Sequence, residues 1–597
     1  MKGINISIGI GIGRKRKKYY TPKNLLTTNS GADNVTALND ALTNHRKVLV
    51  KAGTYNFNNT IWIPSNTELK CESGVTFQKE TGSIYCHIIG NKGMLTNTTD
   101  ANIKIYGNGL NLDINDIDSY SLNDVTICPI LRLRSVFQFH QVDEFIIDNI
   151  YENNPDREDQ FFMCYSACHY GKISNIDSTG AKDNCPILSC TDLEFTNCNF
   201  IASDDAMFLG SGYPNVSVSV NNTERITLTD TTIGSPALIG GYLTRTYGAK
   251  WGNWTNGKTY HDNETCLASN GVVYGRGYNT GGDKVASVEP THATGAVTGA
   301  DGIEWWKMDG SGYTTKVKDI TFKNITFLNE KPSVVFSQSY DEYKDEVLID
   351  NIVFDNIIFP TGYDKYMISN LSVTGNIIIK NSTLYWANML SAGILTYSEL
   401  NSSIEKITID NCNLTLLATK FINMTLNNCT LGELEIKNTI ANLTGTSIVF
   451  LNTITTNVWT KLTTTDCEFT KIGAVFVTHG IGMLLGDNTI YTRTKFISLE
   501  RLVSMPYAST PSVTVRVIDC EIDTSIAYVV AITKAGCHVN YISSGTKYID
   551  PTSYLFFNNQ IAGDLDINLS NSSGTITPAK VRSSNKVTVT ACDLDYV

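Results

Sequence analysis

Residues 181–212 read AKDNCPILSCTDLEFTNCNFIASDDAMFLGSG, and this stretch decides the fold. At its centre, LEFTNCNF (193–200) places strand-forming residues at alternate positions on both sides of an Asn-Cys pair. Alternation with a period of two is typical of a half-buried β-strand. Asn is tolerated in the left-handed backbone conformation that a sharp turn requires. The segment therefore predicts two short strands joined by a tight turn.

The same unit returns along most of the chain. Later copies are ITFKNITF (320–327), IVFDNIIF (352–359), ITIDNCNL (407–414) and VRVIDCEI (515–522). Before them, the turn positions Asn149, Asn175 and Asn197 are separated by 26 and 22 residues. Repeats of this length are typical of solenoids. We expect an all-β fold, a right-handed parallel β-helix wound from one chain over residues 101–540. A two-sheet sandwich is the rival, but its hairpin turns, such as Asn-Gly, are sparse between the units.

The N-terminal part predicts a cap. Residues 33–45 read as a short helix whose N-terminus Asp33 or Asn34 can cap. Its apolar face is formed by Val35, Leu38 and Leu42. Such a helix would cover the open hydrophobic end of the first coil. Residues 28–100 are therefore expected to hold the cap and the first coils.

The first residues form a separate unit, residues 1–27. Ile recurs at every second position from Ile4 to Ile12, and the basic run RKRKK (14–18) follows at once. A lone strand is not stable, so this one is expected to add to a partner's sheet through residues 1–18. A solvated basic tail is the alternative. The basic residues follow the apolar part, which is the reverse of the order in a signal peptide.

Composition excludes several classes of function. The net charge is −11, which makes nucleic acid an unexpected partner. No run of about 18 apolar residues exists, so membrane insertion is not expected. Many of the 15 cysteines share the position after a turn Asn or Asp, and we expect reduced core residues rather than disulfides. No cysteine pair has zinc-ligand spacing with a partner cluster, and neither a metal nor a cofactor is expected.

Residues 234–302 break the repeat. They are rich in glycine and aromatic residues, and they follow the acidic residues of the opening stretch. We expect a long irregular loop that folds over or beside those acids. Its aromatic rings either stack against sugar rings or anchor the loop by packing. The C-terminal residues 541–597 lack clear motifs and are expected to form a last coil, a cap or an oligomerisation module.

Three carboxylates are the candidate catalytic residues. Asp183 and Asp204 lie 21 residues apart, about one coil, and Asp205 follows directly. On successive coils the strands would lie roughly 4.7–4.9 Å apart, so the three side chains would share one small patch. Like charges that close are costly unless a task requires them. Hydrolysis of a glycosidic bond uses two carboxyl groups, one as acid and one as base. A solvated Asp-Asp turn is the alternative.

The segment EWWK (304–307) is the candidate for substrate binding. Glu304, Trp305 and Lys307 would lie one or two coils beyond the carboxylates and could line the same face. The alternative is a surface strand with an ordinary charge pair.

Residues 45–330 resemble the polygalacturonase family of glycoside hydrolases. SDDAMFLGSG (203–212) is similar to that family's Asp-Asp stretch, and AKD (181–183) stands at its Asn-Thr-Asp motif. The resemblance implies an inverting hydrolase in which Asp204 is the general acid, while Asp183 and Asp205 activate the water. The family's Gly-His-Gly motif has no counterpart here. EWWK replaces its Arg-x-Lys motif, with Lys307 standing for the lysine. A uronic acid at the reactive subsite is therefore not implied.

The whole arrangement is similar to phage tailspike proteins. That resemblance implies a homotrimer that binds or cuts a host surface polysaccharide and attaches to the phage tail or baseplate. It also implies a virion protein that is made in the host cytoplasm. The expected function is hydrolysis of a host surface glycan. The alternatives are a non-catalytic receptor-binding or structural spike on the same fold, and an extracellular bacterial pectinase.

Overall fold

The computed structural model describes 33 segments of the chain. These segments are residues 18–80, 87–96, 98–114, 135–153, 161–181, 184–202, 205–210, 221–234, 242–250, 253–261, 265–276, 283–293, 296–307, 314–328, 333–339, 349–358, 368–370, 373–386, 395–397, 403–416, 420–424, 430–443, 449–453, 458–471, 488–497, 501–505, 513–523, 528–532, 538–549, 556–558, 564–574, 581–583 and 587–590.

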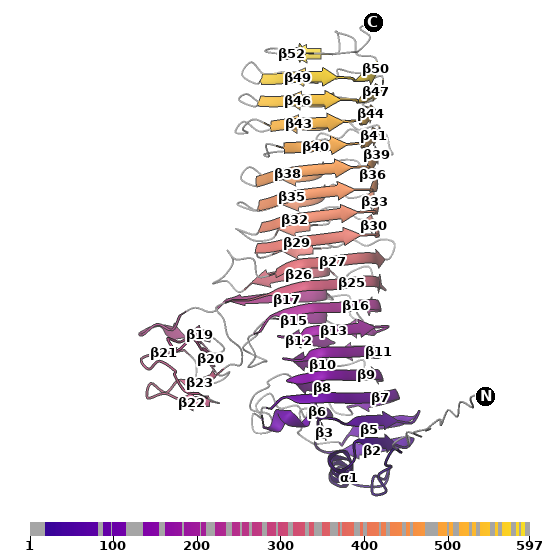
Figure 1. Ribbon diagram of the computed structural model, residues 1–597, viewed down its shortest axis with the longest axis vertical. Helices are drawn as coiled ribbons and strands as arrows, with labels where there is room; N and C mark the ends of the chain where they lie inside the picture. Colours follow the sequence, from indigo (N-terminus) through magenta and orange to yellow (C-terminus); the bar gives the residue numbers. More distant parts are fainter. Residues whose placement is uncertain are drawn as a thin grey trace, which may run out of the picture.

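The described residues form a tall column of stacked strands (Figure 1). The largest sheet of the described residues has 29 strands, and its ladders are parallel. Its strands are β1 (Lys47–Val50), β2 (Gly53–Phe57), β4 (Glu68–Cys71), β5 (Val75–Lys79), β7 (Asp100–Asp113), β9 (Val142–Asn153), β11 (His169–Ala181), β13 (Thr191–Thr196), β14 (Asn199–Ala202), β16 (Thr223–Gly234), β25 (Val317–Phe327), β27 (Ile349–Ile358), β29 (Val373–Lys380), β30 (Thr383–Trp386), β32 (Ser403–Asp410), β33 (Asn413–Leu416), β35 (Thr430–Lys437), β36 (Ile440–Leu443), β38 (Val458–Thr465), β39 (Glu468–Lys471), β40 (Asn488–Thr492), β41 (Lys495–Ile497), β43 (Val513–Ile518), β44 (Glu521–Asp523), β46 (His538–Ser544), β47 (Lys547–Ile549), β49 (Asp564–Ser570), β50 (Ser573–Gly574) and β52 (Val587–Thr590).

A second sheet closes each coil. Its strands are β3 (Ile61–Ile63), β6 (Ile89–Asn91), β8 (Ser135–His140), β10 (Phe161–Ser166), β12 (Cys185–Leu188), β15 (Asp205–Gly210), β17 (Tyr242–Lys250), β24 (Thr314–Thr315), β26 (Ser333–Ser339), β28 (Ile368–Asn370), β31 (Leu395–Tyr397), β34 (Lys420–Met424) and β37 (Val449–Thr453). The same side of the last coils is formed by β42 (Arg501–Met505), β45 (Tyr528–Ile532), β48 (Phe556–Asn558) and β51 (Val581–Ser583). A short 3-10 helix, η1 (Lys92–Leu95), follows β6.

Successive coils pair in register, at an offset of 22 residues for His169↔Thr191 and of 33 residues for Thr191↔Glu224. The chain winds in the right-handed sense that nearly all parallel crossover connections take. The expected right-handed parallel β-helix is confirmed. Coil strands continue through β52, so much of the C-terminal region forms further coils.

The turn asparagines behave as the repeat predicts. Asn149, Asn175 and Asn197 have φ angles of +58°, +55° and +54°. The side-chain amide of Asn197 donates a hydrogen bond of 2.6 Å to the side-chain oxygen of Asn175, one coil below. At one coil Arg493 takes this position at φ +44°, and its guanidinium binds both carboxylate oxygens of Asp466 at 2.6 and 2.8 Å. A ladder of side chains therefore runs along the outside of this turn.

Inside the same turn lies a second ladder of small polar side chains. Its upper rungs are Ser382, Cys412, Thr439, Cys467, Thr494, Cys520, Thr546 and Ser572. Each hydroxyl or thiol donates to the carbonyl two residues earlier, as Cys467 Sγ does to the Thr465 oxygen at 3.2 Å. The ten cysteines among the described residues are free and buried, as expected. Burial raises the pKa of the Cys71 and Cys198 thiols to about 12.

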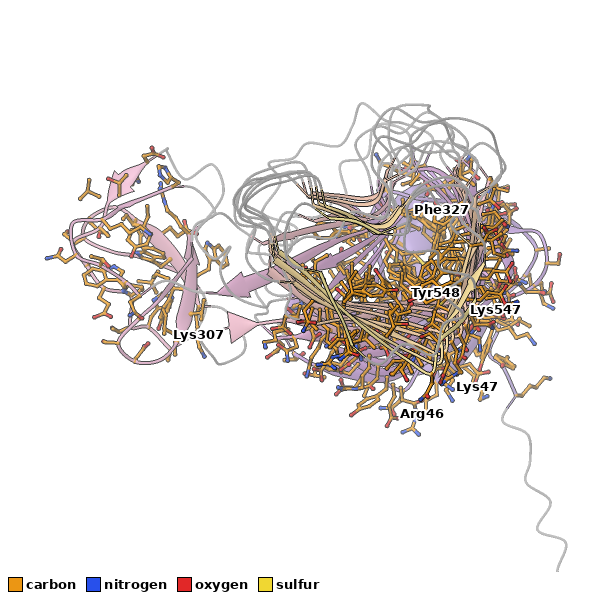
Figure 2. The ribbon with its side chains drawn as sticks, turned by 90° about the horizontal axis from the view of Figure 1, so that it is seen from above. Arg46, Lys47, Lys307, Phe327, Lys547 and Tyr548 are labelled. Atoms are coloured by element: carbon orange, nitrogen blue, oxygen red, sulfur yellow. The ribbon has the colours of Figure 1, made fainter. Side chains whose placement is uncertain are left out.

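Aromatic and aliphatic side chains fill the column. The rings of Phe145 and Tyr165 stack with centroids 5.6 Å apart, and Phe195 meets Tyr165 edge to face at 5.9 Å. Viewed along the axis, Tyr548 points into the column and Lys547 points out (Figure 2). Strand alternation therefore separates core from surface at each level.

The N-terminal cap is confirmed, but its capping residue was predicted wrongly. The helix α1 (Gly31–Asn44) begins after Ser30, whose hydroxyl accepts the Asp33 N–H at 3.2 Å. Asn34 is buried and ties the helix to its surroundings by donating to the Asn56 carbonyl at 3.2 Å. Leu38 is also buried against the first coils. No helix among the described residues is long and apolar enough to cross a membrane.

The expected irregular loop 234–302 contains regular structure: Tyr242–Lys250 is the coil strand β17, and the described residues between 253 and 307 form a lobe. The lobe projects from the side of the column (Figure 1). Its strands are β18 (Thr259–Tyr260), β19 (Thr265–Leu267), β20 (Val273–Arg276), β21 (Lys284–Val285), β22 (Ala296–Thr298) and β23 (Glu304–Lys307), all antiparallel to their partners. Tyr260, Tyr274 and Trp305 are the large side chains of its own hydrophobic core. Those aromatic residues explain why a glycine-rich stretch folds here.

Candidate functional site

The structure describes part of the predicted acidic trio. Asp183 and Asp204 lie outside the described residues. Asp205 begins β15, where its backbone pairs with Tyr242 of β17. The N-terminal residues 1–17, which carry the predicted docking strand, also lie outside the described residues.

Strands β12 and β15 are direct neighbours in the second sheet. Cys185 pairs with Met207 and Ile187 pairs with Leu209, so the offset between these two coils is 22 residues. The offset expected from the sequence was about 21. The two coils that carry the acidic motifs therefore stack without an intervening coil.

Alternation along β15 indicates which positions face outward. Met207 and Leu209 are fully buried in the column core, whereas Phe208 between them is partly exposed. In a regular strand, odd-numbered positions here would point inward and even-numbered positions outward, although Ala206, which has the parity of Phe208, is buried at 1% exposure. Position 205 has the parity of the core residues. A carboxylate at that position reaches the outer face only if the backbone bends where β15 begins.

A buried polar cluster holds the chain just before β12. The Ser178 hydroxyl donates to the Asn184 side-chain oxygen, and both side chains are fully buried. The Asn184 carbonyl accepts the Met163 N–H at 2.9 Å from the coil below. Glu152, which is 2% exposed, pairs in register with Ser178. The residue that follows Asp183 is therefore fixed by hydrogen bonds to its own coil and to the neighbouring one.

The sequence reasoning missed this cluster. Glu152 and Ser178 are in phase with the core residues Ile150 and Ile176. A carboxylate at an inward position of a strand is costly unless it is hydrogen-bonded or paired. Such a residue, one coil before an acidic motif, was the available signal for a functional neighbourhood.

The second sheet is closed to solvent below β12. All six residues of β8 are buried, including Gln138 and His140. The buried His87 donates from Nδ1–H to the Ser135 carbonyl at 2.8 Å, because a carbonyl can only accept. Burial lowers the pKa of both His87 and His140 to about 4. These histidines are neutral near pH 7, and no ligand can reach them from this side.

The segment EWWK does not lie on a coil, which corrects the sequence prediction. It is β23 of the lobe, and it pairs with β20 and β22 in antiparallel fashion. Trp305 is 1% exposed and packs edge to face on Tyr260 at 5.0 Å, so its ring offers no face to a sugar. Glu304 and Lys307 are partly exposed on the lobe, and Figure 2 shows Lys307 apart from the column.

The position at which the lobe is attached to the column also differs from the sequence prediction. It follows the end of β17 at Lys250, whereas Asp205 pairs with Tyr242 at the beginning of that strand. Eight residues of extended strand separate the two points, which is roughly 26 Å at about 3.3 Å per residue. The lobe is therefore attached at the edge of the sheet opposite to Asp205.

Comparison with known proteins finds likeness in fold. No protein-family model matches the chain, and no curated protein matches it. An exopolygalacturonase from Yersinia enterocolitica is 10% identical, with 78% of this chain and 72% of that chain covered at a TM-score of 0.37. The tailspike protein gp49 of Pseudomonas phage LKA1 is 9% identical, with 79% and 75% covered at 0.39.

A third similar structure is a mutant tailspike protein of E. coli bacteriophage HK620 in complex with a pentasaccharide. It is 9% identical, with 92% of this chain and 77% of that chain covered at a TM-score of 0.33. At identities near a tenth, the likeness concerns the fold alone.

Proposed function

We propose that this chain is a tailspike-type depolymerase that hydrolyses glycosidic bonds of a host surface polysaccharide. The observation that carries the proposal is the register of β12 on β15, in which Cys185 pairs with Met207. Counted back by two residues, that register would set Asp183 beside Asp205, and the register of β11 on β14, counted forward by two from Ala181↔Ala202, would set Asp183 beside Asp204. Strands in a sheet lie about 4.8 Å apart, so the acidic motifs of the two coils would share one surface.

The proposed reaction inverts the anomeric configuration. Asp204 donates its proton to the glycosidic oxygen, and the bond from that oxygen to the anomeric carbon breaks. Asp183 and Asp205 take a proton from the water that attacks the opposite face of the sugar ring. An outward position at 204 agrees with the parity of β15, in which Phe208 is the partly exposed residue. The buried Asn184 would hold the turn that carries Asp183.

The assembly and location belong to the same proposal. We infer a homotrimeric virion protein that attaches to the phage tail or baseplate through residues 1–18. The alternating isoleucines and the basic run that follows them support this attachment. A chain that lacks residues 1–18 should fold and bind glycan but should not enter the particle. Normal incorporation of the truncated chain would exclude the docking role.

A non-catalytic receptor-binding spike is the second candidate. One observation favours it: Lys307, which was the candidate counterpart of the family's sugar-binding lysine, lies on the lobe and not on a coil. A spike that only binds would need no such cation at the reactive subsite. It would also need no acidic pair on neighbouring coils, and the 22-residue register argues for that pair.

The experiment compares two carboxylate substitutions. Asp204→Asn should abolish release of reducing ends from purified host polysaccharide and should leave glycan binding intact. Glu304→Gln is the matched control, because Glu304 lies on the lobe and away from the coils. The control should cleave at the wild-type rate. An Asp204→Asn protein that releases reducing ends at the normal rate would refute the assignment of the acid.

A further inference from the structure

A ladder of residues with left-handed backbone conformation runs along one edge of the column. At this edge the chain passes from a strand of the second sheet to the following strand of the main sheet. This turn ladder consists of Asn66, Asn102, Glu144, Tyr170, Asp192, Arg225, Asp319 and Asn351, one on each coil. Asn and Asp adopt this conformation readily because their short polar side chains can bond locally. A bulky residue at positive φ is an outlier, because this conformation strains its backbone. Such strained residues cluster at functional sites.

Glu144 and Arg225 are long side chains at φ +57° and +56°, and Tyr170 is the aromatic residue of this ladder. Its φ angle is +58°, and it is 62% exposed. On neighbouring rungs the side chains link to one another, as when Arg225 binds both carboxylate oxygens of Asp192 at 2.7 and 2.9 Å. A phenol ring cannot extend such a ladder of amides and carboxylates. The left-handed backbone and the exposure together present the ring to solvent at an energetic disadvantage.

The surroundings of Tyr170 suit a sugar. His169 lies beside it with ring centroids 6.5 Å apart, and its Nδ1 is 2.7 Å from the Thr191 hydroxyl. Glu144 and Asp192 occupy the rungs directly below and above. An exposed aromatic ring covers the apolar face of a pyranose, and carboxylates accept hydrogen bonds from its hydroxyl groups.

The charge of this edge selects among glycans. The rungs and their preceding residues carry Asp143, Glu144, Asp192, Glu224, Asp319 and Asp350 against Arg225 and Lys318. The Arg225 guanidinium holds the pKa of Asp192 below its usual value, so that carboxylate is ionised near neutral pH. A strongly anionic polymer would be repelled here, whereas a neutral polymer would not.

The lobe borders the same edge. Tyr170 is the second residue of β11, just after the connection from β10, and the lobe is inserted in the connection from β17 to β25, three coils higher. Three coils correspond to about 14 Å along the axis. Figure 1 shows the lobe beside the coils of β8 to β15, on the side where β11 begins.

We propose that Tyr170, with Glu144 and Asp192 on the adjoining rungs, forms an accessory binding site for a neutral polysaccharide at the edge opposite to Asp205. This inference rests on the proposed glycan function, because it assigns a second contact for the same class of polymer. It would hold the polymer on the column while the acidic residues act elsewhere on it.

The test compares three variants for affinity and thermal stability. Tyr170→Asn should weaken binding of neutral host polysaccharide about five- to tenfold, the size expected for loss of one aromatic contact. Its melting temperature should rise or stay unchanged, because Asn suits the left-handed turn. Tyr170→Phe should keep the affinity within about twofold. The matched control is Asp319→Asn, two rungs above Asp192 and outside the proposed site, at φ +58°. It should retain the wild-type affinity.

The outcomes separate this site from the proposed function. Unchanged affinity in Tyr170→Asn, while the wild type binds and cleaves polysaccharide, overturns the accessory site and leaves the hydrolase intact. A lower melting temperature with unchanged affinity also overturns it, because a packing role would then explain Tyr170. A wild type that neither binds nor cleaves any host glycan overturns both.

Discussion

Acid should weaken the column through its buried histidines. His87 and His140 are fully buried, and burial lowers the pKa of each to about 4, against about 6.5 in an unfolded chain. Above pH 6.5 both residues are neutral in the folded and unfolded states. As the pH falls below 6.5, the unfolded chain takes up protons that the folded column does not bind. The stability that is present above pH 6.5 is therefore lost as the pH falls towards 4.

The size of this loss follows from the two pKa values. Between pH 7 and pH 5, each histidine should lower the free energy of unfolding by about 2 kcal/mol, which is about 4 kcal/mol for the pair. His140→Gln removes one of these two contributions, and the double substitution with His87→Gln removes both. The pH dependence should therefore become shallower in two steps, whatever the stability of each variant at pH 7.

The assay is urea unfolding of the wild type and both variants at pH 8, 7, 6 and 5. The interval from pH 8 to 7 is the internal control, because both histidines are neutral there in both states. Carboxylates that titrate near pH 5 cancel when each variant is compared with the wild type. Equal losses of free energy between pH 7 and 5 in all three proteins would show that these histidines are not buried as described.

Three further predictions concern the ladders and the lobe. Asn411→Ala should lower the free energy of unfolding by about 1–3 kcal/mol, because Asn411 has φ +52° and its side-chain amide donates to the Asn381 side chain at 2.8 Å. Asn411→Gly should cost less, because glycine adopts this conformation without strain. A larger loss in the Gly variant would contradict the left-handed constraint. Cys467→Ser should change the melting temperature by only a few degrees, because hydroxyls fill the same ladder on adjacent coils; loss of folding would mean that sulfur itself is required. Trp305→Ala should cost the lobe about 3–5 kcal/mol, and limited proteolysis should then remove the lobe from an intact column; simultaneous cleavage of the column would show that the two do not fold separately.

The coil was predictable from the sequence because one local rule repeats. A turn needs a left-handed residue, and Asn149, Asn175 and Asn197 supply it at coil-length intervals. Four of the cysteines were predictable for the same reason, since each directly follows the left-handed turn residue: Cys198, Cys412, Cys467 and Cys520. The rule misses exceptions that rely on a neighbouring coil. Arg493 is held in the left-handed position by Asp466, 27 residues away, and nothing near it in the sequence indicates this.

The site was less predictable because an insertion interrupts the period. The register jumps by 94 residues between Glu224 and Lys318, so counting coils across it placed EWWK on the wrong structure. A pair of tryptophans gives no sign of whether it faces solvent or a small core of its own. Tyr260 and Tyr274, which bury Trp305, come together with it only through antiparallel pairing within the lobe. The acidic motifs precede the insertion, so counting coils between them did not cross it.

The hydrolase account is tested most directly by following the anomeric protons of a host surface polysaccharide by NMR while the purified wild-type protein acts on it. The account predicts that reducing ends appear and that the first anomer formed has the configuration opposite to that of the bond cleaved. A preparation that binds this polysaccharide but yields no new reducing ends would contradict it and leave a binding spike. Retention of configuration would contradict the roles given to Asp183, Asp204 and Asp205.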